Sequence, residues 1–271
     1  MPVNDRNGVK VWQRRTSRES LLLWCGWLIG VAAFVWCWQQ ISEATTWFFV
    51  FDAPNIAGDI WRRATPPKWE YITKLGKPIW DTLNIATLGT LISLVLAVPV
   101  AFLAARNTTP SALFVRPIAL LIIVSTRSIN SLIWALLLIA IIGPGVFAGV
   151  VAIAIRSIGF CAKLLYEAIE EIDATQVEAI TATGASRWQV MVYGIVPQIL
   201  PAFAGIAVFR WDINIRESTV LGLVGAGGIG LQLSSSLNVL AWPQVSLILL
   251  VILFAVVISE WVSAKVRGAI I

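Results

Sequence analysis

The chain has 271 residues, of which 58% are apolar and 13% are charged, whereas charged residues make up about a quarter of an average soluble domain. The net charge is +5, and the sequence contains no histidine, which excludes Ser/His/Asp triads and HExxH metal sites. The cysteines Cys25, Cys37 and Cys161 lie in apolar segments and indicate neither a disulfide framework nor a metal site. We therefore expect no catalytic residue and no metal ligand.

Charged side chains are absent from five long stretches, and a helix that crosses a bilayer needs only about 20 residues. We predict an all-α polytopic membrane protein, in which the excess of Lys and Arg marks the cytoplasmic side. Nucleic acid is not an expected partner. The uncharged stretches are residues 20–42, 82–105, 128–155, 188–209 and 218–259.

The first span is predicted at residues 21–38. Basic residues from Arg6 to Arg18 precede this span and place the N-terminus in the cytoplasm. The span ends in Trp-Cys-Trp and lacks a small-x-small cleavage site, so we expect a retained helix rather than a cleaved signal peptide. Residues 43–81 are rich in aromatic side chains, which favour the membrane interface, and are expected to lie on the outer face.

Five further spans bring the predicted total to about six and return the C-terminus to the cytoplasm, where Lys265 and Arg267 follow the positive-inside rule. Residues 221–238 are rich in Gly and Ser, and we expect them to form a partial or re-entrant segment that lines a cavity. The five spans are predicted at residues 82–105, 117–142, 146–166, 195–212 and 243–259.

A polar segment, residues 167–193, lies between the fourth and fifth spans. Thr175 with Glu178 and Ser186 with Gln189 fit two capping boxes, and Gly184 suits the left-handed residue that ends the first helix. We predict two short helices separated by a glycine turn, parallel to the membrane on its cytoplasmic side. A plain amphipathic linker is the alternative interpretation.

This loop resembles the EAA coupling loop of type I ABC importer permeases. The resemblance rests on the spacing of Glu178-Ala179, Gly184 and Pro197, although Ile180 stands where that pattern has its third alanine. It implies a type I permease fold, a second copy of the chain, two ATP-binding subunits and an extracytoplasmic solute-binding protein. The resemblance assigns ATPase coupling to Glu178, Ala179, Gly184, Ser186, Gln189 and Pro197.

The resemblance also divides the chain into two parts. Residues 1–76 are expected to hold the N-terminal cytoplasmic tail, the first transmembrane helix and the outer-face segment. Residues 77–271 are expected to form the permease core. No G-x-x-x-x-G-K-[ST] loop occurs in the sequence, so we place ATP and Mg²⁺ on the partner subunit and expect no cofactor on this chain.

Several arginines lie within predicted spans, where a charge costs several kcal/mol and marks a functional hypothesis. Arg127 and Arg156 are expected at a depth of about 15 Å, near the bilayer midplane. Arg127 would share a helical face with Asn130 and Ser131, and the two arginines would line an anion path, since guanidinium matches oxyanions. Internal pairing is an equal alternative for both, and it is the preferred interpretation for Arg210 and for Arg216, which has Asp212 at i, i+4.

A second segment, residues 210–230, resembles phosphonate-transport permeases. The shared pattern includes Arg210, Asn214, Arg216 and Thr219 and ends in the glycine cluster, whereas Trp211, Asp212, Glu217 and Ser218 depart from it. Glu217 adds a negative charge beside the expected anion path. The expected substrate pathway is Arg127, Asn130, Ser131, Arg156, Arg210, Asn214, Arg216 and Thr219, and the expected gate is Gly225, Gly227, Gly228 and Gly230.

The two resemblances together predict the non-catalytic permease subunit of a bacterial inner-membrane ABC importer for phosphonate or a related phosphorus oxyanion, such as phosphite or phosphate. The nearest alternative keeps the fold and changes the cargo to another small solute such as methionine. A secondary transporter that needs no ATPase is the alternative from another class.

Overall fold

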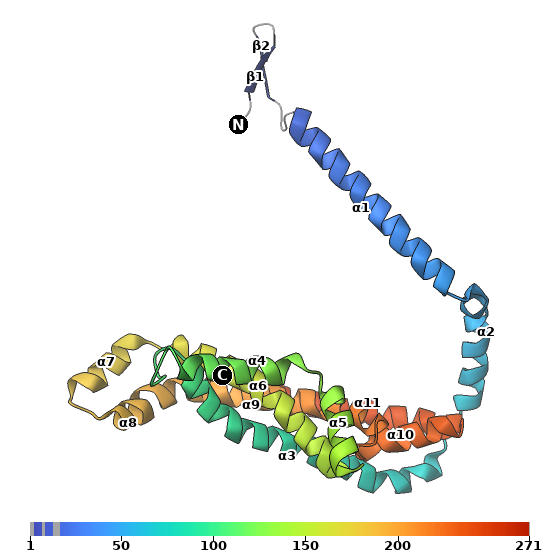
Figure 1. Ribbon diagram of the computed structural model, residues 1–271. Helices are drawn as coiled ribbons and strands as arrows, with labels where there is room; N and C mark the ends of the chain where they lie inside the picture. The colour runs from blue at the N-terminus through green and yellow to red at the C-terminus, as the bar shows by residue number, and fades with distance from the viewer. Residues whose placement is uncertain (1–2, 7–8, 13–16, 271) are drawn as a thin grey trace. The chain divides into compact units, whose positions relative to one another are not determined.

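The computed structural model describes residues 3–6, 9–12 and 17–270 of the chain (Figure 1). The chain divides into two units, residues 1–62 and 63–271, each with its own internal contacts. The second unit thus begins before the boundary at residue 77 that the sequence suggested.

The first unit contains a short hairpin and a long apolar helix. Strands β1 (Val3–Arg6) and β2 (Val9–Trp12) pair in antiparallel fashion, and sequence analysis did not predict them. Helix α1 runs over Ser17–Ala44 and is long and apolar enough to cross a membrane. It exceeds the predicted span because polar residues at both ends continue the helix. Helix α2 (Trp47–Ala64) follows, with no buried residue.

The second unit consists of helices that pack along one another (Figure 1). They are η1 (Trp69–Tyr71), α3 (Ile72–Ala104), α4 (Val115–Ser128), α5 (Ser131–Ile142), α6 (Val146–Glu170), α7 (Ala174–Ala182), α8 (Arg187–Val190), η2 (Met191–Ile195), α9 (Val196–Leu223), α10 (Gly228–Asn238) and α11 (Trp242–Ile270).

Small side chains bring the central helices close together. Ala97 and Ala101 of α3 and Cys161 and Ala162 of α6 are fully buried in one cluster, to which α4 and α9 also contribute. Farther along, Gly89 of α3 lies against Ile153 of α6. Small residues let helix backbones approach closely, which is the usual basis of packing between membrane helices. The pair α3 and α6 therefore forms the framework on which the other helices rest.

Two helices extend beyond the predicted spans. Helix α3 begins at Ile72, ten residues before the predicted start of the second span at residue 82. Helix α9 continues to Leu223, well past the predicted end near Asp212. Arg210 and Asp212 lie within the predicted span and Arg216 and Glu217 lie beyond it, but all four belong to one continuous helix and pair with one another.

The third predicted span is broken in the structure. Residues 117–142 were predicted as one helix, whereas α4 and α5 meet at an angle of 88°. Ile129 is extended, and the side chain of Asn130 accepts a hydrogen bond from the backbone N–H of Leu132 at 3.1 Å, which caps α5. Asparagine is a favoured N-cap. Five helices of the described residues are long and apolar enough to span, or six if this bent pair counts as one.

The glycine-rich segment contains a short helix. Helix α10 has 11 residues and is about 16 Å long, half of the hydrocarbon thickness. A turn connects it to α9, and Gly225 and Gly227 in that turn have positive φ angles of 99° and 85°. The dimension of α10 is that of a partial segment, as the sequence predicted, although residues 221–223 belong to the end of α9.

A membrane cavity and a projecting hairpin as the candidate functional sites

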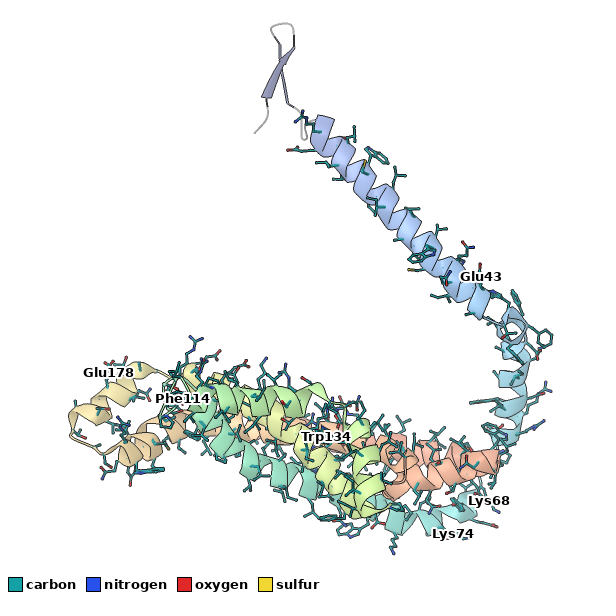
Figure 2. All side chains as sticks on the ribbon, in the orientation of Figure 1. Glu43, Lys68, Lys74, Phe114, Trp134 and Glu178 are labelled. Atoms are coloured by element: carbon teal, nitrogen blue, oxygen red, sulfur yellow. The ribbon has the colours of Figure 1, made fainter. Side chains whose placement is uncertain are left out.

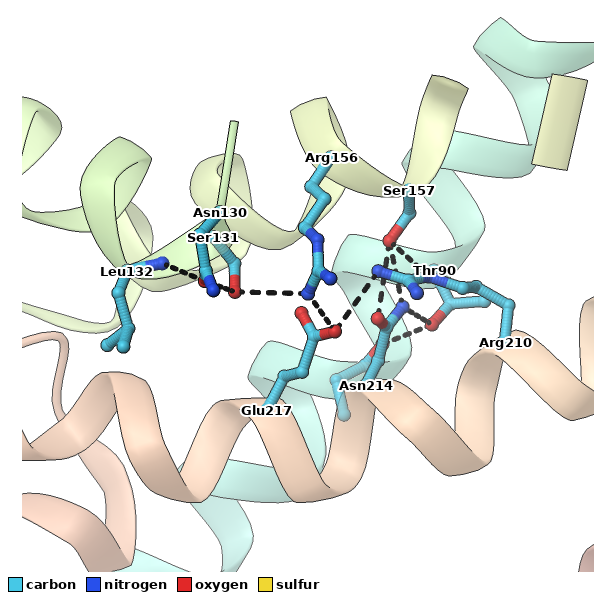
Figure 3. Close-up of polar contacts among 10 residues, drawn as sticks. Thr90, Asn130, Ser131, Leu132, Arg156, Ser157, Arg210, Asn214 and Glu217 are labelled. Carbon is cyan, nitrogen blue, oxygen red and sulfur yellow. Dashed lines mark hydrogen bonds and ion pairs between the residues drawn. The ribbon is translucent and has the colours of Figure 1, made fainter. Parts of the chain in front are cut away.

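A buried polar network connects α3, α6 and α9 (Figure 3). Asn214 is completely buried, and its amide donates to Thr90 Oγ1 at 2.8 Å and to Ser157 Oγ at 3.2 Å. Arg210 is 2% exposed, donates from Nε to Ser157 Oγ at 2.9 Å, and lies over the ring of Phe160. Because these polar groups are paired within the bundle, Arg210 and Asn214 bind neighbouring helices rather than facing an open path.

Glu217 joins this network to a second arginine. Its Oε1 accepts a hydrogen bond from Arg156 and lies 3.5 Å from Nη2 of Arg210 (Figure 3). Arg210, Asn214 and Glu217 follow one another at i, i+4 and i+7 on α9, so one helical face carries all three. Arg156 also lies 3.5 Å from Ser131 Oγ at the start of α5. Glu217 is therefore the counter-ion of two arginines.

A cavity of about 560 Å³ opens beside this network. Its charged wall is formed by Arg156, Arg216 and Glu217, and the N-terminal end of α5 contributes Asn130 and Ser131. The remaining lining is apolar. Such a concave site with a few convergent polar groups is the usual form of a small-molecule site. The lining residues are Asn130, Ser131, Leu132, Arg156, Phe209, Ile213, Arg216, Glu217, Val220 and Leu221.

Arg216 pairs with Asp212, as the i, i+4 spacing predicted. The hydroxyl of Ser259 on α11 donates to Asp212 Oδ1 at 2.8 Å, which ties the pair to a neighbouring helix. Asp212 is buried, whereas nearly half of the Arg216 side chain is exposed toward the cavity. The preferred interpretation of Arg210 and Arg216, internal pairing, is thus confirmed for both.

The structure brings together only part of the expected substrate pathway. Asn130, Ser131, Arg156 and Arg216 line the cavity. Thr219 instead donates to the carbonyl of Arg216 at 2.7 Å.

Arg127 does not share a helical face with Asn130 and Ser131, and that prediction was wrong. It is exposed near the end of α4, whereas Asn130 caps α5 beyond the 88° bend. A single continuous helix had been assumed, and the extended Ile129 between α4 and α5 removes that geometry.

The predicted gate glycines form a tightly packed corner. The N–H of Gly145 donates to the carbonyl of Gly225 at 3.1 Å, and Gly227 lies against Val146. Where α9 and α10 cross, a Cβ on Gly222 would lie 2.7 Å from the Cα of Gly230, so neither helix tolerates a side chain there. Gly228 also has a positive φ, 73°, beside Thr82. The gate function of these residues stays a prediction.

A hairpin of α7 and α8 projects from one end of the second unit, opposite the end that holds Lys68 and Lys74 (Figure 2). Asp173 caps α7 by accepting from the backbone N–H of Thr175 at 2.9 Å, so the predicted Thr175–Glu178 capping box was wrong. The cap begins earlier because the aspartate carboxylate binds the free N–H groups of the first turn.

The second half of the hairpin follows the prediction. Gly184 has a φ of +80°, and the reciprocal bonds of the Ser186–Gln189 capping box are both present. Helix α8 then continues through η2 into α9, with Pro197 in the first turn of α9. The residues assigned to coupling all lie on the exposed surface: Glu178, Ala179, Gly184, Ser186, Gln189 and Pro197.

The base of the hairpin is tied to the bundle. Gln198 accepts from the backbone N–H of Asp173 at 3.0 Å. Glu170, at the end of α6, accepts from the backbone N–H of Arg106 at 2.9 Å and pairs with Arg116 at 3.5 Å. The base of the hairpin thus contacts α9 directly, and the end of α6 that leads into it contacts the connection between α3 and α4. Among the described residues, no group of three or more His, Cys, Asp or Glu side chains could hold a metal ion.

Residues 97–267 match the family described as the binding-protein-dependent transport system inner membrane component. The chain belongs to this family. It is 39% identical over 232 residues to the phosphite transport system permease protein of Stutzerimonas stutzeri, which covers 85% of this chain and 83% of that protein. It is also 39% identical over 206 residues to the phosphate-import permease protein of Mycolicibacterium smegmatis, which covers 76% of this chain and 38% of that longer protein.

Solved structures agree on the fold. An inward-facing structure of the MetNI methionine ABC transporter contains a chain with a TM-score of 0.65 and 20% identity, which covers 75% of this chain and 99% of that one. A bacterial ABC transporter involved in the import of alginate gives a TM-score of 0.58 at 17% identity, over 92% and 96% of the two chains. The family member described here is a non-catalytic, multi-pass permease subunit of a bacterial inner-membrane ABC importer, with the type I fold.

Proposed function

We propose that this permease carries a phosphorus oxyanion, namely phosphonate, phosphite or phosphate. The observation that carries this proposal is the cavity between α5, α6 and α9, which presents Arg156 and Arg216 beside the amide of Asn130 and the hydroxyl of Ser131. Arg156 follows the start of α6 by ten residues, a depth of about 15 Å and thus near the midplane of a bilayer. The similarity to a phosphite permease over most of the chain supports the same cargo class.

The chemistry of the cavity favours anions. A guanidinium group presents parallel N–H donors that match two oxygens of a phosphate-like group. The charged cluster at the cavity wall holds three arginines, Arg156, Arg210 and Arg216, against two carboxylates, Asp212 and Glu217. Asn130 and Ser131 add neutral donors to the remaining oxygens. The apolar side chains around them exclude water and strengthen each charged contact.

We propose that the complete importer contains two copies of this chain. Arg127 is exposed on α4, eleven residues and about 16 Å from Arg116 at the expected cytoplasmic end. An arginine at that depth facing lipid would cost several kcal/mol. A second copy placed against α4 would enclose Arg127 in a path between the two subunits, where a passing anion would meet its charge.

Two ATP-binding subunits and an extracytoplasmic binding protein complete the proposed assembly. The exposed hairpin of α7 and α8 would dock on the ATP-binding subunits, because it presents polar caps to water and is tied to the bundle at Asp173. ATP binding would draw the two hairpins together and open the cavity outward to accept cargo from the binding protein. Hydrolysis would then restore the inward-open state.

The test is the ATPase rate of the purified complex in lipid, with its binding protein loaded with phosphite, phosphate or methylphosphonate. We expect at least one of the three loaded forms to stimulate hydrolysis well above the unloaded binding protein. A methionine-loaded sample serves as the comparison for the other cargo class. Stimulation by none of the three phosphorus compounds would contradict the proposed cargo.

A further inference from the structure

Two buried atoms of the Arg156–Glu217–Arg210 cluster have no hydrogen-bond partner: Oε2 of Glu217 and Nη2 of Arg210. Burying a polar atom without a partner costs about 1–3 kcal/mol. The two atoms belong to residues that already touch, because Nη2 of Arg210 lies 3.5 Å from Oε1 of the same carboxylate. A small movement of Glu217 toward Arg210 would therefore satisfy both atoms in one bidentate pair.

The two arginines on either side of Glu217 differ in access. The Arg156 side chain is 29% exposed and lines the cavity, whereas that of Arg210 is 2% exposed and does not. Arg210 is also fixed by Ser157 and by the ring of Phe160. A carboxylate that left Arg156 would thus free a guanidinium at the cavity wall and would keep its own charge compensated inside the bundle.

We propose that Glu217 is an exchangeable counter-ion: its carboxylate holds Arg156 while the cavity is empty, and moves onto Arg210 when the oxyanion of the cargo takes its place on Arg156. This inference rests on the proposed function. Carboxylate and phosphorus oxyanion offer the same paired oxygens to a guanidinium, so they compete for one site. Neither Arg156 nor Arg210 is left without a counter-ion at any stage, which avoids the high cost of an unpaired buried charge.

The exchange also sets how tightly the cargo is held. A transport site must bind its cargo strongly enough to admit it and weakly enough to release it. Competition from the Glu217 carboxylate lowers the affinity of Arg156 for the anion. When the carboxylate moves back to Arg156, it displaces the anion. Glu217 is thus a positioning residue, whose removal should strengthen anion binding rather than weaken it.

The experiment measures equilibrium binding of phosphate, phosphite and methylphosphonate to the full complex in lipid nanodiscs, without nucleotide or binding protein. Glu217→Gln removes the competing charge and keeps the shape, and we expect it to tighten binding of the transported anion by about tenfold. Arg210→Met removes the alternative partner and leaves the carboxylate on Arg156, so we expect binding to weaken by a similar factor. Glu167→Gln, whose partner Lys163 lies on the same helix outside the cavity, is the matched control.

A merely structural role for Glu217 predicts a different pattern, in which both variants weaken binding. The double variant Glu217→Gln with Arg210→Met leaves no unpaired charge in the buried network, because the remaining Arg156 lines the cavity. This variant provides the test if the single Glu217→Gln chain fails to accumulate. Unchanged or weaker anion binding in the double variant would overturn the exchange. If the wild-type complex transports none of the three anions, the proposed function itself fails, whereas transport without tightening refutes only the role of Glu217.

Discussion

The hairpin of α7 and α8 and the polar network of α3, α6 and α9 are held together in opposite ways. No residue of α7 or α8 is buried, and the hairpin is shaped by caps and by one glycine turn. The network is buried and is shaped by bonds between residues more than 50 positions apart, such as Arg210 with Ser157 and Asn214 with Thr90. A change in the hairpin should therefore stay local, whereas a change in the network should affect three helices at once.

The largest effect is expected in the network, from Asn214→Leu. Thr90 would lose the donor to its Oγ1 and Ser157 would lose both of its bonds to Asn214, and each lost bond to a buried group costs about 1–3 kcal/mol. We expect the free energy of unfolding to fall by about 3 kcal/mol. The amount of folded protein recovered from the membrane should fall with it. Thermal unfolding of the purified complex measures this effect. Asn238→Leu, on an exposed residue at the end of α10, is the matched control.

A smaller and purely functional effect is expected in the hairpin, from Gly184→Val. A β-branched residue at a φ of +80° is strained by about 1–3 kcal/mol, which would reshape the turn without touching the bundle. We expect ATP-driven uptake to fall more than tenfold, while the unfolding temperature of the membrane helices stays unchanged. Ala182→Val, in the preceding helix, controls for the added side chain. A lower unfolding temperature of the membrane helices, together with the loss of uptake, would show that the two regions are not independent.

The smallest effect is expected from Ser186→Ala, which removes the cap of α8. Loss of an N-cap costs about 1 kcal/mol, and the hairpin keeps its glycine turn and its tie at Gln198. We expect uptake to fall only a few-fold. Ser186→Asp should restore it, because aspartate caps as well as serine does. A failure of the aspartate to rescue uptake would mean that the hydroxyl contacts a partner rather than the backbone.

Sequence analysis predicted these two regions unequally, for a physical reason. The Ser186–Gln189 cap and the Gly184 turn are local, and their signals lie within a few residues. The bend between α4 and α5 also had a local signal, Asn130 as an N-cap, but the apolar residues around it masked the break. The counter-ion role of Glu217 had none, because Arg156 and Ser157 approach α9 only through the packing of α6, which no local spacing reports.

The predicted end of the fifth span was wrong for a related reason. A charge was taken to mark the end of a span, yet Asp212, Arg216 and Glu217 remain in a continuous helix. Each finds an opposite charge on its own or a neighbouring helix. Paired charges are tolerated inside a bundle where single charges are not. Counting charges therefore predicted about the right number of spans and placed the end of the fifth too early.

Arg156 is the cavity residue expected to bind the cargo most directly. ATP-driven uptake of phosphite, phosphate and methylphosphonate into proteoliposomes should be compared between the wild-type complex and Arg156→Gln, with Lys163→Gln as the control outside the cavity. The variant should fold, because Glu217 retains Arg210 as a partner. We predict a loss of more than tenfold in uptake of whichever anion the wild type carries, with basal ATP hydrolysis unchanged. Uptake by Arg156→Gln within twofold of the wild type would contradict a role for Arg156 in cargo binding.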